Sequence, residues 1–417
     1  MRSTFSQVPF LGWLLGGLAA VTVEHLVGFQ LAGLLGMPRV PVLFGCVVML
    51  KKPLLIPAAA TFVLLVYVVP ACVVARVSAP ITNRIASRLL RFPVVLPVLF
   101  HLALLYGILE MWSDLSAYRD LTLRLTLISV MLTLSLNVIN GYMGEFSCSH
   151  PGFMALGAYA ASVFTLGLFA NDRVFGPAVL PPALGSFVFP FGLFLGGGVA
   201  ALGALAIAVP SFRTRGDYLA IISLAFMFIV KSAIENLEVV GGPRGLSSHP
   251  NWATLPAVFF WTVACVWVIH NFVSSTLGKA LNAVRDDEMA AEAMTVNTRK
   301  TKVVAFLFGA FWAGVAGGLF AHVLRYVNPG TFGLQKLAEV LAMVYFGGLN
   351  SVYGSIVGAV SLSLLGEALR PLEIFKWIII PLLLILVMIY RPTGLIAFRD
   401  FDVKRIIRPR DGKGEQV

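Results

Sequence analysis

The sequence predicts an all-α integral membrane protein, a polytopic bundle of about 10 to 12 transmembrane helices, some of them interrupted at glycine. Of its 417 residues, 58% are hydrophobic and only 12% are charged, and the mean hydropathy is +0.88. Apolar runs repeatedly reach about 20 residues without a charge, the length that a helix needs to cross a ~30 Å hydrocarbon core. Such long runs indicate helices, because a membrane β-barrel would show short alternating segments instead.

The expected spans follow from these runs. In chain order they are Val8–Val23, Leu54–Ala75, Val94–Trp112, Leu121–Asn140, Pro151–Ala170, Phe187–Val209, Tyr218–Glu235, Thr254–Phe272, Val303–Leu324, Leu337–Leu349, Val352–Leu369 and Phe375–Tyr390. The spans on either side of Gly347-Gly348 require a turn at that dipeptide. The first apolar stretch also fits a cleaved signal peptide that ends near Ala19-Ala20, but a retained first span is the simpler interpretation for a multi-span protein.

Basic residues account for the net charge of +11, and they cluster in short segments beside the apolar runs. This distribution is typical of the positive-inside rule and argues against nucleic-acid binding. The basic segments are the loop with Arg76, Arg84, Arg88 and Arg91, the turn with Arg213 and Arg215, residues 276–302, and the tail from Arg391. If all four are cytoplasmic, the loops outside are Asn171–Pro182, Asn236–Ala253 and Arg325–Lys336. Lys51-Lys52 fits this topology poorly.

Thr276–Lys302, the polar segment, is a charged and helix-forming stretch between two apolar runs. Because charged side chains are costly in hydrocarbon, we expect it in water at the membrane face. Its first part carries an apolar stripe with helical spacing, formed by Leu277, Ala280, Leu281 and Val284. A second short helix of small side chains follows, which Asp286 or Asp287 can cap. Small side chains let a partner approach the backbone, so the segment predicts docking of a soluble protein.

Two glycine-rich polar breaks interrupt apolar runs: the first break, Asn140–His150, and the second break, Gly347–Gly354. Paired interruptions in two halves of a transporter indicate a binding site near the membrane midplane. Two ordinary turns are the alternative, and the topology above places both breaks on one side. The candidate pathway residues are Asn140, Gly141, Tyr142, Gly144, Glu145, Ser147, His150, Gly347, Gly348 and Asn350.

The sequence shows no catalytic or metal-binding pattern. HExxH and GxSxG are absent, and the four cysteines (Cys46, Cys72, Cys148, Cys265) have no CxxC spacing, so we expect neither an enzyme nor a metal site. Ionisable residues near the apolar runs, such as Glu24, are scattered and most fall near span ends, which favours an interfacial role. No GxxxxGK[ST] motif occurs, so this chain binds no ATP by a P-loop and holds no cofactor. An ATPase would be another subunit.

Several ordered motifs resemble one family. They are NGYxGxxS at 140–147, HxGF at 150–153 with GAY at 157–159, RGDYLAI at 215–221, GGPxGL at 241–246, and GGL with a later glycine at 347–354. The polar segment followed by Val303–Leu324 is similar to the EAA-type coupling loop of ABC-importer permeases. Together these motifs resemble LivM-type permease subunits of branched-chain amino acid importers, over roughly Leu121–Gly394.

The resemblance implies a bacterial inner-membrane permease with no enzymatic activity of its own. It implies as partners a second, LivH-like permease, two cytoplasmic ATP-binding subunits and a periplasmic solute-binding protein. The ATPase-coupling residues would be Arg285, Asp287, Glu288, Ala291, Ala293 and Met294. Arg213, Arg215 and Asp217 would lie at the cytoplasmic face.

The implied organisation is an additional N-terminal membrane region (1–115), a permease core (116–394) and a basic cytoplasmic tail (395–417). Departures from the family pattern are Thr295, where the loop usually has the glycine that easily makes a left-handed helix stop, and Ser149, which replaces a frequent glycine. Arg244 occupies a variable position in an external loop. The substrate stays open among branched-chain or other hydrophobic amino acids, amides, urea-like solutes and aromatic acids. A stand-alone secondary transporter is the alternative class.

Overall fold

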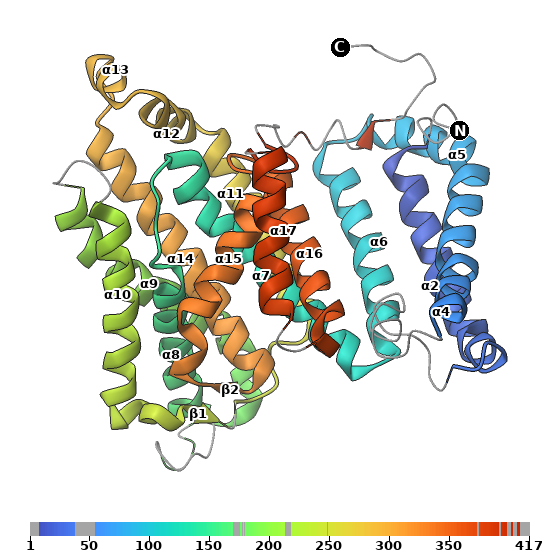
Figure 1. The fold of residues 1–417 in the computed structure, drawn as a ribbon, viewed down its shortest axis with the longest axis horizontal. Coiled ribbons are helices and arrows are strands. Elements are labelled where there is room, and N and C mark those ends of the chain that lie inside the picture. The colour runs from blue at the N-terminus through green and yellow to red at the C-terminus, as the bar shows by residue number, and fades with distance from the viewer. Residues whose placement is uncertain are drawn as a thin grey trace. The chain divides into compact units, whose positions relative to one another are not determined.

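The computed structural model describes residues 8–37, 55–169, 176, 178, 180–212, 218–247, 249–372, 375–391, 393–397, 402, 407 and 408. Helices make up nearly all of this part of the chain, and its one sheet pairs two strands of two residues each. The predicted all-α class is therefore confirmed (Figure 1). Lys51-Lys52, Arg213, Arg215, Asp217, Cys46 and most of the C-terminal tail lie outside the described residues.

The chain divides into two compact units, each described here by itself. Unit 1 comprises residues 1–123, 364–378 and 402–417, and unit 2 comprises residues 124–363 and 379–401. The first division falls near the predicted boundary at residue 115, and the assignment of a separate N-terminal region stays a prediction.

Unit 1 is helical and combines three stretches of the chain. Its elements are α2 (Phe10–Leu34), α4 (Ile56–Val63), the π-helical turn η3 (Leu64–Val68), α5 (Val69–Leu89), α6 (Val95–Asp114), the start of α7 (Ala117–Asn137), the end of α16 (Val352–Ala368), η8 (Arg370–Leu372) and the start of α17 (Lys376–Tyr390). Helix α2 lies directly against α5, where a Cβ on Gly16 would stand 2.5 Å from the Ala71 carbonyl oxygen. Glycine thus permits the two backbones to meet.

A buried ion pair holds α2 to the start of α7. Arg119 Nη2 donates to Glu24 Oε1 at 2.7 Å, and both side chains are almost fully buried. The Arg119 guanidinium also lies 5.1 Å from the centre of the Trp112 ring. The predicted interfacial role for Glu24 is therefore wrong, because α2 continues to Leu34 and leaves this carboxylate in the middle of a helix.

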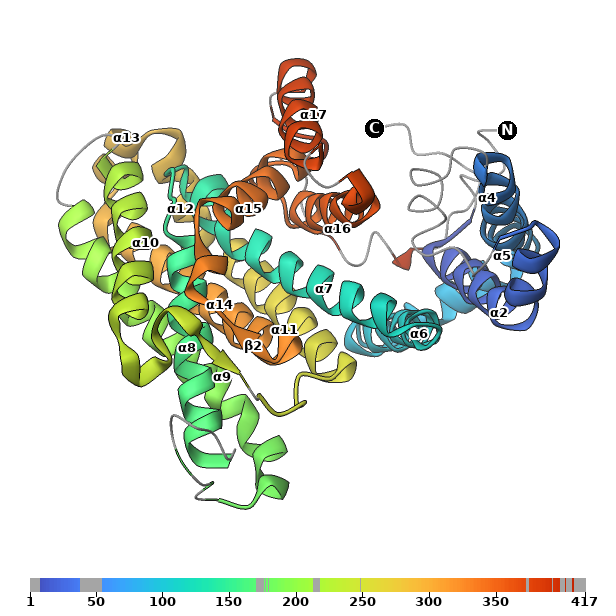
Figure 2. The same ribbon diagram turned by 60° about the horizontal axis from the view of Figure 1, so that its bottom comes forward.

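Unit 2 contains the remaining elements. They are the rest of α7, the π-helical η4 (Val138–Met143), α8 (His150–Phe169), α9 (Pro182–Ser211), α10 (Tyr218–Asn236), η5 (Glu238–Val240), η6 (Gly242–Arg244), β1 (Leu246–Ser247), α11 (Leu255–Ser274), α12 (Thr276–Asp286), α13 (Glu288–Ala293), α14 (Thr298–Leu324), β2 (Tyr326–Val327), η7 (Pro329–Phe332), α15 (Leu334–Gly347), the start of α16 and the end of α17. Figure 2 shows α8, α9 and α14 side by side. They meet at glycines: a Cβ on Gly157 would lie 2.1 Å from the Gly314 carbonyl oxygen.

The two ends of unit 2 carry different structures. Helices α12 and α13 lie at one end and the β1–β2 pair lies at the other (Figure 1). Leu246 pairs with Val327 in that antiparallel pair, so two loops that the sequence places outside the cell meet each other. This separation agrees with the expected sidedness, in which the polar segment is on the opposite face. Arg244, next to β1, is exposed.

The helices differ from the expected spans in two places. Nine described helices are long and apolar enough to cross a membrane. Helix α15 has 14 residues and a length of about 21 Å, too short to cross alone, so the expected span Leu337–Leu349 is not a full crossing. The basic loop expected at Arg76–Arg91 is helical up to Leu89, because this stretch contains no glycine and its Pro80 is accommodated within α5. The turn required at Gly347–Asn350 is present.

Candidate functional site

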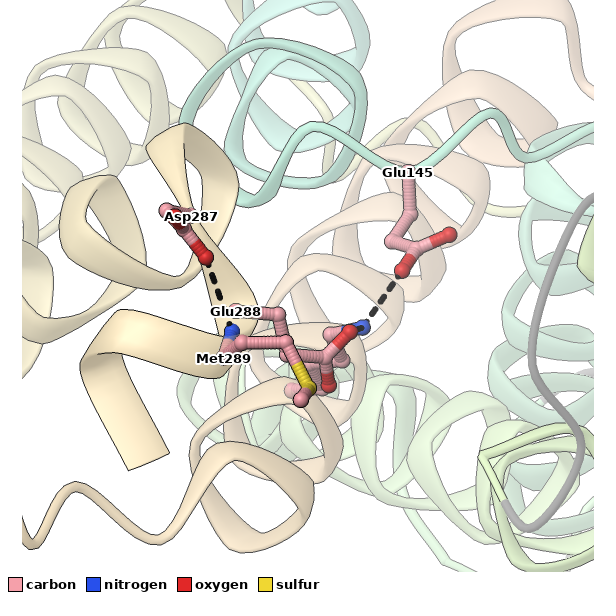
Figure 3. A network of polar contacts seen from close by, with 5 residues as sticks. Glu145, Asp287, Glu288 and Met289 are labelled. Atoms are coloured by element: carbon pink, nitrogen blue, oxygen red, sulfur yellow. Dashed lines mark hydrogen bonds and ion pairs between the residues drawn. The ribbon is translucent and has the colours of Figure 1, made fainter. Parts of the chain in front are cut away.

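The polar segment forms two short helices joined at Asp287. Ser275 caps α12, its hydroxyl accepting from the Gly278 amide at 3.4 Å. Asp287 has an extended backbone, and its Oδ1 accepts from the amides of Met289 and Ala290 at 3.0 Å each (Figure 3). The predicted cap of the second helix is thus Asp287. Asp286 instead pairs with Arg285, 2.7 Å away.

Helix α13 ends at a non-glycine residue in the left-handed region. Thr295 has φ of 67°. The Val296 amide donates to the Ala291 carbonyl at 3.1 Å and the Thr295 amide donates to the Glu292 carbonyl at 3.0 Å. These two bonds define a Schellman motif, for which glycine is the usual residue at the position of Thr295. The helix stop that glycine makes easy therefore forms here with threonine.

The inner face of α12 packs on the first break. Leu281 and Val284, two members of the predicted apolar stripe, are buried. Arg285 Nη1 donates to the Gly141 carbonyl at 3.4 Å. Glycine is required at position 144 for two reasons. A Cβ there would lie 2.4 Å from Arg285 Cγ, and the backbone has φ of 76°, in the left-handed region. The polar segment and the first break are therefore in direct contact.

Lys302, at the first turn of α14, connects three elements. Its ammonium lies 2.7 Å from Glu145 Oε1 in the first break and 2.9 Å from Glu288 Oε2 in α13. The Lys302 side chain is 11% exposed and Glu145 26%, whereas Glu288 is 46% exposed. Figure 3 shows Glu145 and Glu288 on facing elements. The shared ammonium balances one of the two carboxylate charges and holds them together.

The first break is an interrupted helix that stays folded. Helix α7 passes into the π-helical η4, and residues 144–149 then run extended to α8. Asn140 Oδ1 accepts from the Ser147 amide at 3.3 Å, and the Cys148 amide donates to Ser223 Oγ of α10 at 2.9 Å. The backbone groups released by the interruption thus find partners within unit 2.

Asn137 joins the first break to the second. Its Nδ2 donates to Ser355 Oγ at 2.6 Å and to the Ser351 carbonyl at 3.0 Å, and its Oδ1 accepts from the Asn350 amide at 3.2 Å. A Cβ on Gly141 would lie 2.6 Å from the Asn350 nitrogen. Asn137 lies within an expected apolar span and was not among the candidate residues. A signal was present, because polar residues recur along α7 and η4 at helical spacing: Thr122, Thr126, Ser129, Thr133, Asn137 and Asn140.

The predicted site residues fall into groups by burial. In the polar segment, Ala291 is buried against this chain, while Ala293 and Met294 are exposed. Met289, which the sequence analysis did not select, is 66% exposed and Met294 is 77% exposed. Of the pathway candidates, the buried ones are Asn140, Gly141, Tyr142, Ser147, His150, Gly347 and Gly348. Glu145 and Asn350 are half-buried, and Gly144 is exposed. Their role as a pathway stays a prediction.

The family match and the relatives of this chain agree on one family. Residues 118–389 match the family described as branched-chain amino acid transport system / permease component. The chain is 31% identical over 328 residues to the high-affinity branched-chain amino acid transport system permease protein LivM of Escherichia coli K12, covering 70% of this chain and 73% of that protein. LivM of Salmonella typhimurium is 30% identical over the same shares.

A shorter match involves a second type of permease. LivH of Escherichia coli K12 is 30% identical over 126 residues, 30% of this chain and 40% of LivH. No solved structure matches. These relatives are transport permeases, and the long apolar helices make this chain a multi-pass membrane protein. The chain belongs to the family of branched-chain amino acid transport system permease components and is of the LivM type.

Proposed function

We propose that this chain is one of two different permease subunits of an ATP-binding-cassette importer in the bacterial inner membrane. Its partners are a LivH-like permease, two cytoplasmic ATP-binding subunits and a periplasmic solute-binding protein. The solute is a branched-chain or other hydrophobic amino acid, or a related small solute. Support comes from the family membership, from the names of the relatives and from the polar segment, which stands apart from the apolar helices.

One observation carries the proposal: α13 presents an outer face to a partner while its inner face is bonded to the interrupted helix. Met289 on α13 and Met294 just after its last residue are both exposed. Methionine adapts its shape to a partner's groove, which suits a docking helix. On the inner side, Glu288 reaches Lys302, and Lys302 reaches Glu145. A displacement of α13 by an ATP-binding subunit therefore acts directly on the first break.

The displacement would then pass to the second break. Asn137 bonds the backbone of Asn350 and Ser351, so the two breaks are linked through buried amide groups. Glycines at both breaks let other backbone and side-chain atoms pack directly against the main chain, and glycine can adopt backbone conformations that other residues rarely do. In this proposal the polar segment receives the displacement from the ATP-binding subunit. The two joined breaks then open or close the solute path.

The test is ATP-dependent uptake of radiolabelled leucine by the complete importer. Glu288→Lys places a like charge beside Lys302 and is expected to abolish uptake while the chain still inserts and co-purifies with the second permease. Glu292→Lys is the matched control, since it makes the same charge change on an exposed residue of α13 and is expected to retain at least half of the uptake. Unchanged uptake by Glu288→Lys would refute the coupling role.

The same preparations separate this proposal from a stand-alone secondary transporter. The proposal requires that the wild-type chain co-purifies with a P-loop ATPase and that leucine uptake stops without ATP. Uptake that persists without ATP and collapses with the proton gradient would establish the other class.

A further inference from the structure

Helices α4, η3 and α5 form one continuous rod that is too long for a membrane. The rod runs from Ile56 to Leu89, 34 residues, which corresponds to about 51 Å. At a tilt of 40°, the upper end of the usual range, it would still rise about 39 Å against a hydrocarbon core of about 30 Å. Its first part, Ile56–Ala75, is uncharged and matches the core by itself. The part from Arg76 onward therefore lies in the headgroup region or beyond.

The two faces of α5 differ sharply in this outer part. The inner face consists of small residues packed on α2: Ala75, Thr82 and Ala86 are fully buried. The opposite face carries Arg84 and Arg88, and Arg91 follows in the turn after the helix, at the same angular position. All three arginines are exposed, as is Arg76.

No acidic residue lies near this basic face in the sequence. The sequence contains no Asp or Glu from Ile56 to Leu109. Among the residues that the structure describes, none of the ion pairs involves Arg76, Arg84, Arg88 or Arg91. The three guanidinium groups along one face of the helix, with Arg76 on a neighbouring face, repel each other and favour an anionic ligand. Guanidinium groups fit the oxygens of phosphate in a bidentate manner.

Apolar side chains accompany the arginines and decide which anion fits. Val77 is 71% exposed, Ile81 61% and Phe92 55%. A soluble phosphate makes no apolar contact with such side chains. A phospholipid contacts them with its acyl chains and binds the arginines through its phosphodiester. We infer that the outer part of α5 and the turn after it, Arg76–Phe92, bind the headgroups of anionic phospholipids. Phosphatidylglycerol is the probe of choice because it is a simple anionic lipid.

The experiment titrates phosphatidylglycerol against the purified full-length chain in neutral detergent and counts bound lipids by native mass spectrometry. Arg84→Gln/Arg88→Gln/Arg91→Gln is expected to weaken binding about 100-fold, since each basic residue at an anionic surface contributes roughly fivefold. The matched control, Arg244→Gln/Arg299→Gln/Lys300→Gln, removes three exposed charges elsewhere and is expected to bind as the wild type does. Phosphatidylcholine is expected to bind weakly to all of them.

Two further arms separate the possible causes. Arg84→Lys/Arg88→Lys/Arg91→Lys keeps the charge and is expected to restore most of the binding, so a loss equal to that of the glutamine variant would overturn the inference. Inorganic phosphate at millimolar concentration is expected not to displace the lipid. Displacement by phosphate, equal binding of phosphatidylcholine, or an equal loss in the control variant would each show that this face is not an anionic-lipid site.

Discussion

Replacing Thr295 by glycine is expected to stabilise the end of α13. Thr295 holds φ of 67°, where its β-branched side chain costs roughly 1–2 kcal/mol. Glycine adopts this conformation freely but loses about 0.5–1 kcal/mol more backbone entropy on folding than other residues do. The net gain is therefore about 0.5–1 kcal/mol, confined to the helix end. It corresponds to a roughly two- to fivefold change in the population of the opened helix end.

Hydrogen exchange measures this change directly. The amides of Thr295 and Val296 donate the two bonds that close the helix, and in Thr295→Gly they should exchange about two to five times more slowly. Mass spectrometry of a peptide that spans α13 and its end reports the rate in the purified full-length chain. Global melting is a poor readout here, because the helix end opens independently of the bundle.

Thr298→Gly is the matched control. Thr298 is the first residue of α14 and has ordinary helical geometry, so glycine there should loosen the helix start by about 0.5–1 kcal/mol. The two variants make the same chemical change and are expected to shift local exchange in opposite directions. Faster or unchanged exchange at the end of α13 in Thr295→Gly would show that the strain assigned to Thr295 is absent.

Three other variants test the helix cap, the glycine packing and the joint between the breaks. Asp287→Ala should weaken α13 by about 1 kcal/mol and speed exchange of its first amides, whereas Asp286→Ala, which removes only an exposed pair, should change it by less than about 0.5 kcal/mol. Gly157→Ala should abolish the yield of monodisperse protein on size-exclusion chromatography, and Gly198→Ala, with open space around it, should leave that yield unchanged. Asn137→Leu removes three hydrogen bonds and leaves the Asn350 amide without its partner, so it should lower the melting temperature, through a loss of about 1–3 kcal/mol.

Local patterns were readable in the sequence. The apolar runs predict the all-α class because a membrane helix must satisfy its own backbone. A cap at Asp286 or Asp287 and a stripe containing Leu281 and Val284 were predicted from local patterns, and the structure confirms the stripe and shows Asp287 as the cap. The charge of the polar segment predicts its position at the end of a bundle.

Contacts between distant residues were not readable. Glu24 and Arg119 lie far apart in the chain, and each alone resembles an interfacial charge. Asn137 looked like part of an apolar run because its partners lie more than 200 residues away, in α16 and the turn before it. The length of α5 was also misjudged, since arginines are good helix formers and a basic stretch therefore does not by itself end a helix. Pairing is a property of the fold, and spacing along one helix does not report it.

The contacts that connect α13 to the two breaks differ in strength. The weaker contacts are expected to rearrange first when α13 is displaced. The Glu288–Lys302 contact is nearly half exposed on one side, so it contributes about 0.5 kcal/mol and can exchange with water. The Asn137 side chain is buried, and opening its bonds would leave its own amide group unpaired at a cost of about 1–3 kcal/mol. A load on α13 would therefore rearrange the charged contacts before it separated the two breaks. We therefore expect the two breaks to move together as one body when α13 is displaced. Replacing Asn137 should therefore uncouple the two breaks even while the charged contacts of Lys302 persist. The effects of variants at Asn137 and at Lys302 can thus be told apart.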